Sequence, residues 1–146
     1  GFVDAYADME AALAYAREHF PEAPVLVVGS SYSSALVFHL AADHPDDVTA
    51  VLSFSPGEYF GRSGKPADWI TAAAANVQCP VFITSAKDEA ERWASIYAAL
   101  DVEVNASFTP STAGQHGSRA LWEQFDDHAG YWEAVGAFLE RFVGDE

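Results

Sequence analysis

The sequence predicts an α/β fold: a parallel β-sheet of about four strands with helices on both faces, in three layers. Apolar runs with strand character alternate with segments of helical spacing along all 146 residues. A helix follows each expected strand, which implies right-handed crossovers between parallel strands. Half of the residues are hydrophobic, enough to form the core of one domain.

The first expected elements surround a short serine-rich segment. Ala, Leu, Met and Tyr at helical spacing predict a helix over Asp4–Phe20, which Pro21 ends. Val25–Val28 is an apolar run typical of a buried strand. Helical spacing then continues over Ser33–His44 until Pro45 interrupts it.

The same alternation continues to the end of the chain. There is no internal repeat, low-complexity tract or linker, so residues 1–146 are expected to form a single domain. Further strands are expected at Val48–Phe54, Val81–Ser85 and Val102–Phe108, and further helices at Ala67–Asn76, Glu89–Leu100, Leu121–Phe125 and Tyr131–Phe142.

Acidic residues dominate the charge, with 22 Asp and Glu against 7 Lys and Arg and a net charge of −15. Such a surface repels phosphate backbones and anionic membranes, so neither nucleic acid nor a membrane is expected as a partner. These residues contain no signal peptide and no apolar run near the roughly 18 residues that span a bilayer. We expect a soluble protein, cytoplasmic or exported; the single Cys79 excludes an internal disulfide without separating these compartments.

The segment Gly29-Ser30-Ser31-Tyr32-Ser33 has the form of a sharp turn that carries a nucleophile between a strand and a helix. It matches G-x-S-x-G, with Ser33 in the last glycine position. Positions 29 and 33 need small residues because bulky side chains would collide in so sharp a turn. The turn exposes the Ser31 hydroxyl and directs a helix N-terminus at the charge that develops there. The alternative is an ordinary loop in which Ser30 or Ser31 caps the helix.

Polar residues also follow the other three strands, among them Ser55 after the second. The carboxyl ends of parallel strands meet at one edge of a sheet, where ligands bind. Asp88 lies three residues past the third strand, and His116 follows the fourth. A serine nucleophile needs a base, and the base needs a carboxylate to hold its tautomer. We therefore expect Ser31 as nucleophile, His116 as base and Asp88 as acid.

Each of these residues also has an ordinary structural interpretation. Asp88 alone fits a helix N-cap. Glu89 is the second candidate for the acid, although an acidic residue is also favourable where a helix begins. His116 alone fits a solvated loop residue, while Gly114 and Gly117 on either side of it allow the loop to bend over the sheet.

No pattern for metal or phosphate binding is present. The histidines and acids lack metal-ligand spacing, one cysteine makes no zinc site, and the glycines form no phosphate-binding loop. No metal is therefore expected. Trp69, Trp93, Trp122 and Trp132 lie in helical patterns and are expected to be packing residues, whereas Tyr59 and Phe60 either line a substrate pocket or cover the core.

With these motifs the chain resembles the α/β-hydrolase superfamily, in particular its dienelactone-hydrolase-like branch. The resemblance rests on the turn at Ser31, the strand Cys79–Ile83 that leads to Asp88, and His116-Gly117. It implies a serine hydrolase without a cofactor, which cleaves a carboxylic ester, thioester or lactone of a small acyl substrate through an acyl-enzyme. It also implies that the backbone N–H of Tyr32 donates to the oxyanion.

The family fold has about eight strands, about twice the number expected here. This truncated α/β-hydrolase fold is expected to lack the N-terminal strands, which makes Val25–Val28 an exposed apolar edge. Three explanations stay open: part of a longer hydrolase, a homodimer that completes the sheet, or a non-catalytic module that associates through its edge. A flavodoxin-like binding domain is a further alternative, in which His116 lies far from Ser31.

Overall fold

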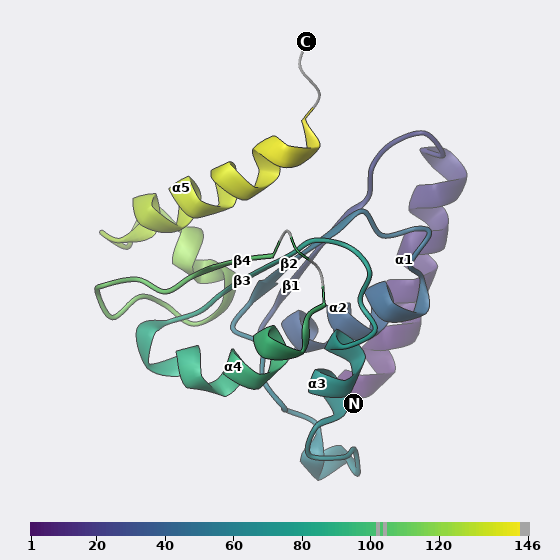
Figure 1. Ribbon diagram of the computed structural model, residues 1–146, viewed down its shortest axis with the longest axis horizontal. Helices are drawn as coiled ribbons and strands as arrows, with labels where there is room; N and C mark the ends of the chain where they lie inside the picture. Colours follow the sequence, from purple (N-terminus) through teal and green to yellow (C-terminus); the bar gives the residue numbers. More distant parts are fainter. Residues whose placement is uncertain (102, 104, 144–146) are drawn as a thin grey trace.

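Four parallel strands form one sheet in the order in which they occur along the chain (Figure 1). The computed structural model describes residues 1–101, 103 and 105–143. The predicted parallel α/β architecture is confirmed. The strands are β1 (Leu26–Ser30), β2 (Ala50–Phe54), β3 (Val81–Thr84) and β4 (Ala106–Phe108).

Helices cover both faces of this sheet and give it three layers (Figure 1). Side chains alternate across β2, so Val51 packs on one face while Leu52 and Phe54 pack on the other. One face is covered by α1 (Ala5–His19), α2 (Tyr32–Asp43), α3 (Trp69–Ala74) and α4 (Ala90–Ala99), and the other by α5 (His128–Leu139). Short 3₁₀ turns complete the described chain: η1 (Phe2–Asp4), η2 (Gly61–Ser63), η3 (Lys87–Glu89), η4 (Gly117–Leu121) and η5 (Glu140–Phe142).

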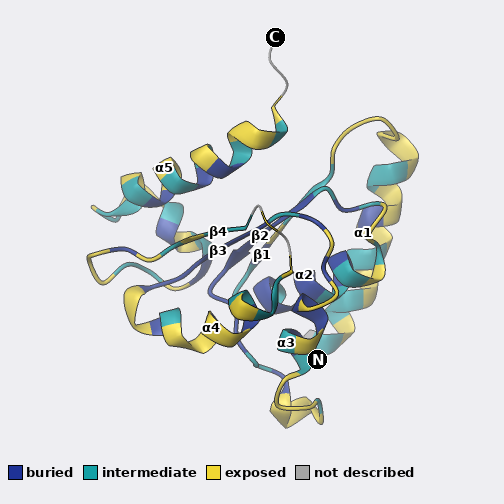
Figure 2. Ribbon diagram, viewed as in Figure 1, coloured by how far each residue is buried: buried dark blue, intermediate teal, exposed yellow. Residues whose placement is uncertain are grey.

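Burial is deepest in the two central strands, where every residue of β2 and β3 is buried (Figure 2). A strand that is covered on both faces has no polar side in its sequence, which explains the continuous apolar run at residues 81–83. The carboxyl ends of these strands are therefore anchored in the rigid part of the molecule.

Two expected elements near the C-terminal half differ most from the structure. The expectation of a helix over Leu121–Phe125 is wrong. The 3₁₀ turn η4 ends at Leu121, and turns follow because Trp122 takes an extended conformation. The fourth strand begins only at Ala106, after the Asn105 side chain has accepted a hydrogen bond from the Val81 N–H at 3.0 Å. Val102 and Val104, which were expected in this strand, lie outside the described residues.

The first strand lies at the edge of the sheet and extends two residues further than expected, to Ser30. Val28 on this strand is 60% exposed, while Leu26 on the same face packs on the core beneath α5. An apolar groove of about 260 Å³ runs between α1 and β1, lined in part by Met9 and Leu13. The expected apolar edge strand is therefore present.

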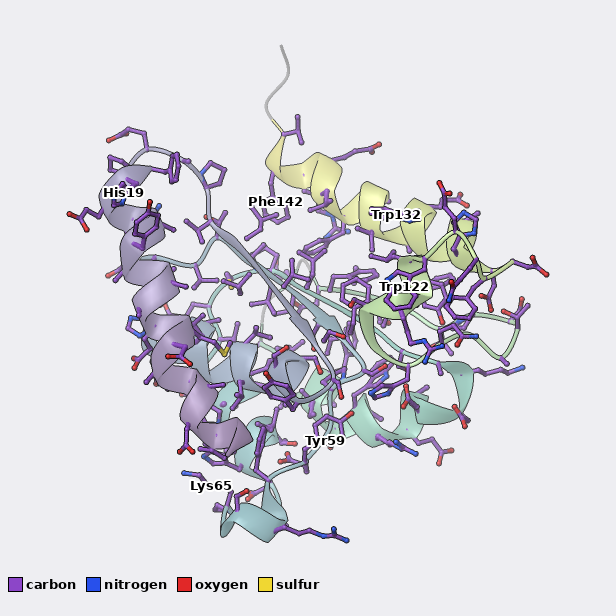
Figure 3. All side chains as sticks on the ribbon, turned by 180° about the vertical axis from the view of Figure 1, so that it is seen from behind. His19, Tyr59, Lys65, Trp122, Trp132 and Phe142 are labelled. Carbon is purple, nitrogen blue, oxygen red and sulfur yellow. The ribbon has the colours of Figure 1, made fainter. Side chains whose placement is uncertain are left out.

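The tryptophans divide into an inner and an outer pair. Trp93 is buried and Trp69 half-buried, as expected. Trp122 and Trp132 are 54% and 50% exposed and lie at the surface, with Trp132 on α5 itself (Figure 3). The Arg119 guanidinium covers part of the Trp122 ring, so this ring packs against a cation instead of the apolar interior.

No helix within the described part of the chain has the length and apolar character needed to span a membrane.

Candidate active site

Ser31 forms the sharp turn between β1 and α2. Its φ of 57° lies in the left-handed region, an unusual conformation for a residue with a side chain. Gly29 has no room for a side chain, because a Cβ there would lie 2.4 Å from the carbonyl oxygen of Ser33. The expected sharp turn, with its requirement for a small residue at position 29, is confirmed.

Ser33, which stands where the motif has its last glycine, closes this turn with its hydroxyl. That hydroxyl accepts the Ser30 N–H and donates to the Ser30 carbonyl oxygen, both at 2.9 Å. Ser31 is the N-cap residue of α2, but its side chain makes no capping hydrogen bond. The Ser31 hydroxyl is therefore not engaged in holding the helix, which speaks against the capping alternative.

His116 lies beside Ser31, although 85 residues separate the two along the chain. The Nε2 atom of His116 is 2.9 Å from the Oγ atom of Ser31, and its Nδ1 atom is 2.5 Å from Oε1 of Glu89. The imidazole is 45% exposed, whereas the Glu89 side chain is 9% exposed. A serine hydroxyl, an imidazole and a buried carboxylate thus form one continuous hydrogen-bonded chain. This proximity contradicts the flavodoxin-like alternative.

The carboxylate on His116 belongs to Glu89, so the expectation that Asp88 contacts His116 is wrong. Both residues lie in the 3₁₀ turn η3, where consecutive side chains point about a third of a turn apart. Asp88 faces solvent, and Glu89 faces the interior and reaches the imidazole with its longer side chain. Glu89 also begins α4 as its N-cap residue, so the position at the helix start and the contact with His116 belong to the same side chain.

Several donors surround the Glu89 carboxylate. Its Oε2 atom accepts the Ser55 hydroxyl at 2.8 Å and the Ala86 N–H at 3.3 Å, while Arg92 lies 3.5 Å from Oε1. Burial alone would raise the pKa of Glu89, but the hydrogen bonds from Ser55, His116 and Ala86 outweigh it and hold the pKa below its ordinary value. The group is therefore a carboxylate at neutral pH.

The loop that carries His116 is fastened to the ends of two other strands. The Gly117 N–H donates to Ser55 at 2.8 Å, and the Ser118 N–H donates to the Ser30 hydroxyl at 2.9 Å. Gly114 and Gly117 have φ values of 69° and 67°, and a Cβ at position 117 would lie 2.6 Å from the Ser30 oxygen. Both glycines thus adopt a conformation that favours glycine and lets the loop bend over the sheet, as expected.

Two serines support the histidine loop in a way that the sequence did not indicate. Ser30 and Ser55 directly follow the buried parts of their strands, and both hold the histidine loop. The only signal for them was their position at strand ends.

Of the aromatic residues after β2, Phe60 is buried against Trp69 and covers the core, and Tyr59 donates to the Ser55 carbonyl oxygen.

Within the described ranges, no group of three or more His, Cys, Asp or Glu is placed to hold a metal ion.

Tyr32 is the first residue of α2, so its N–H lies at the helix N-terminus directly after Ser31. A serine hydroxyl, an imidazole and a helix N-terminus thus meet at one edge of the sheet, and groups of these kinds serve nucleophilic attack, proton transfer and oxyanion stabilisation.

Known proteins with this fold share the architecture at low sequence identity. A dienelactone hydrolase from Anabaena variabilis superposes with a TM-score of 0.70 at 15% identity, covering 99% of this chain and 62% of its own. A monoacylglycerol lipase from Paleococcus ferrophilus gives 0.67 at 12% identity, with 98% and 76% coverage. Alpha/beta hydrolase domain-containing protein 10 from mouse gives 0.60 at 15% identity, with 94% and 70% coverage. The chain thus spans less than two thirds of the length of the dienelactone hydrolase.

Comparison with individual curated proteins gives no match. Comparison with family models does identify the family. The family model described as "alpha/beta hydrolase fold" matches residues 4–80, which is more than half of the chain and includes the turn at Ser31. The chain therefore belongs to the α/β-hydrolase fold family.

Proposed function

We propose that this chain is a serine hydrolase that cleaves a carboxylic ester, thioester or lactone bond. The observation that carries the proposal is the hydrogen-bonded chain from Glu89 through His116 to Ser31, with contacts of 2.5 and 2.9 Å. A half-exposed imidazole between a buried carboxylate and a serine hydroxyl is the arrangement that activates a serine nucleophile.

The proposed reaction has two halves. Ser31 Oγ attacks the carbonyl carbon of the substrate while His116 Nε2 takes its proton, and Glu89 stabilises the resulting imidazolium. The Tyr32 N–H stabilises the negative oxygen of the tetrahedral intermediate. His116 then protonates the departing alcohol or thiol, which leaves an acyl group on Ser31. Water attacks this ester while His116 takes its proton; His116 then returns the proton to Ser31 Oγ as the bond to the acyl group breaks, which releases the acid and restores the serine.

The comparisons support the reaction class without defining the substrate. The names of the dienelactone hydrolase and the monoacylglycerol lipase describe hydrolysis of a lactone and of a lipid ester by proteins of this fold. Both reactions proceed through attack on a carbonyl carbon, which is the chemistry that the contacts of Ser31 and His116 favour.

A fluorophosphonate probe tests the proposal, because it reacts covalently with activated serines. We expect one label per chain, located on Ser31 by peptide mass spectrometry and abolished by Ser31→Ala. The exposed Ser111→Ala is the matched control and should label normally. A folded protein in which Ser31 stays unlabelled contradicts the proposal.

A second candidate function is association through the edge of the sheet. It is favoured by the position of β1 at the end of the strand order and by the 60% exposure of Val28. An unpaired apolar edge strand is a template for another strand, supplied by a second copy or by a further segment. In this alternative the chain is a non-catalytic hydrolase-like module.

A further inference from the structure

Ser55, directly after β2, combines deep burial with an unfavourable backbone conformation. Its φ is 62°, and it is 1% exposed. Among the described residues other than glycine, positive φ values occur at Ser31 and Ser55. Such conformations persist where surrounding contacts enforce them, and they concentrate at functional sites. One of the two belongs to the proposed nucleophile.

The Ser55 hydroxyl connects the two loops that carry the acid and the base. The Gly117 backbone N–H donates to Ser55 Oγ at 2.8 Å, and Ser55 Oγ lies 2.8 Å from Glu89 Oε2. An N–H group can only donate and an ionised carboxylate can only accept. The single hydroxyl proton of Ser55 therefore points at Glu89, and a lone pair points at Gly117.

The backbone of Ser55 is fixed on both sides. Its N–H donates to the Thr84 carbonyl oxygen of β3 at 2.7 Å, and its carbonyl oxygen accepts the Tyr59 hydroxyl. The hydroxyl is thus presented from the centre of the sheet by a segment that has little freedom to move.

We propose that Ser55 is a positioning residue that orients Glu89 toward His116. By holding Oε2, Ser55 directs the remaining oxygen, Oε1, at the Nδ1 atom of His116. By accepting the N–H of Gly117, it also fixes the position of the residue next to His116. This inference rests on the proposed function, since it assigns Ser55 a part in the same reaction.

Two replacements of Ser55 distinguish the effect of its hydroxyl from the effect of its unfavourable backbone conformation. Ser55→Ala removes the hydroxyl and keeps a side chain at positive φ, whereas Ser55→Gly removes both. Ser53→Ala is the matched control, because Ser53 is an equally buried serine two residues earlier, within β2, whose hydroxyl donates to the Ser34 carbonyl oxygen at 2.8 Å.

We expect Ser55→Ala and Ser55→Gly to lower kcat about tenfold, with a smaller change in KM, because the lost hydrogen bond is to a charged group. The acidic limb of the pH–rate profile should move to higher pH by roughly one unit, since Glu89 becomes easier to protonate. Ser53→Ala should keep the position of this limb, even where it lowers thermal stability. Ser55→Gly should unfold at a higher temperature than Ser55→Ala.

A second measurement does not depend on activity. The Glu89 carboxyl is followed by ¹³C NMR titration of protein labelled at the glutamate side-chain carboxyl, with Glu89→Gln identifying the resonance. We expect the Glu89 midpoint to rise in both Ser55 variants and to stay unchanged in Ser53→Ala.

The two proposals fail in different ways. Absence of ester hydrolysis and of Ser31 labelling in the wild-type protein contradicts the proposed function, while the NMR titration still tests whether Ser55 controls Glu89. An active wild-type enzyme whose Ser55 variants keep the same acidic limb and the same Glu89 midpoint overturns the positioning role. The positioning role is also overturned if Ser53→Ala shifts the acidic limb and the Glu89 midpoint as much as the Ser55 variants do.

Discussion

The Nδ1 atom of His116 and the Oε1 atom of Glu89 lie 2.5 Å apart, although they belong to loops that follow different strands. The two loops are also joined through the backbone, where the Lys87 N–H donates to the Ala113 carbonyl oxygen at 2.9 Å. Because β3 and β4 are parallel neighbours, both loops leave the sheet at the same edge. The contact between the imidazole and the carboxylate therefore rests on the pairing of these strands.

Neutralising Glu89 should have a far larger effect on catalysis than neutralising its neighbour Asp88. We expect Glu89→Gln to lower kcat by about two to four orders of magnitude, because an amide no longer holds the required tautomer or stabilises the imidazolium. Asp88→Asn, at an exposed position of the same turn, should leave kcat within about twofold of the wild type. Hydrolysis of p-nitrophenyl esters measures both. An equal loss in Asp88→Asn would contradict the assignment of Glu89.

Glu89 should also make stability depend on pH. Its folded-state pKa is below the ordinary value of 4.5, so ionisation favours the folded state. This contribution is complete above pH 4.5 and is lost as the pH falls through the lowered folded-state pKa. Urea unfolding between pH 7 and pH 3 should therefore show a steeper loss for wild type than for Glu89→Gln. The exposed Glu133→Gln is the control and should follow the wild type.

Gly29 should be intolerant of even the smallest side chain. A Cβ at this position meets the backbone of Ser33 and Ser34 at 2.4 to 2.7 Å, and backbone atoms cannot move aside cheaply. We expect Gly29→Ala to destabilise the protein by at least about 2 kcal/mol in chemical unfolding.

Gly136 provides the matched comparison for Gly29. It lies in α5, and a Cβ added there would have no neighbouring atom within 4 Å, so Gly136→Ala should stabilise the protein by about 0.5–1 kcal/mol through helix propensity. Comparable unfolding free energies for Gly29→Ala and the wild type would show that the turn adopts a different conformation.

The edge of β1 should determine whether copies of the chain associate. We expect concentration-dependent association in sedimentation velocity, and Val28→Lys should shift the protein toward monomer, because a charge on an edge strand opposes strand addition. Val143→Lys is the control, since Val143 is 71% exposed but lies outside the strands. A wild-type protein that stays monomeric at high concentration would argue against self-association through this edge.

The parts of the site that were predictable from the sequence depend on local requirements. The turn at Ser31 needs small residues within a few positions, and Gly29 and Ser33 meet that need in the sequence itself. The arrival of His116 at the same edge was predictable because alternating strands and helices force a parallel sheet. Its glycine neighbours likewise indicated a bent loop.

The sequence by itself determined the α/β architecture, the sharp turn at Ser31 and the edge of the sheet that carries the candidate site, because periodicity and steric limits act over short stretches of chain. Only the tertiary structure decided between Asp88 and Glu89, adjacent acids on one 3₁₀ turn whose directions depend on how η3 packs. It likewise decided the partners of the Ser55 hydroxyl, since Glu89 and Gly117 lie 34 and 62 residues away along the chain. Such contacts are set by the docking of strands and loops, which no local pattern encodes.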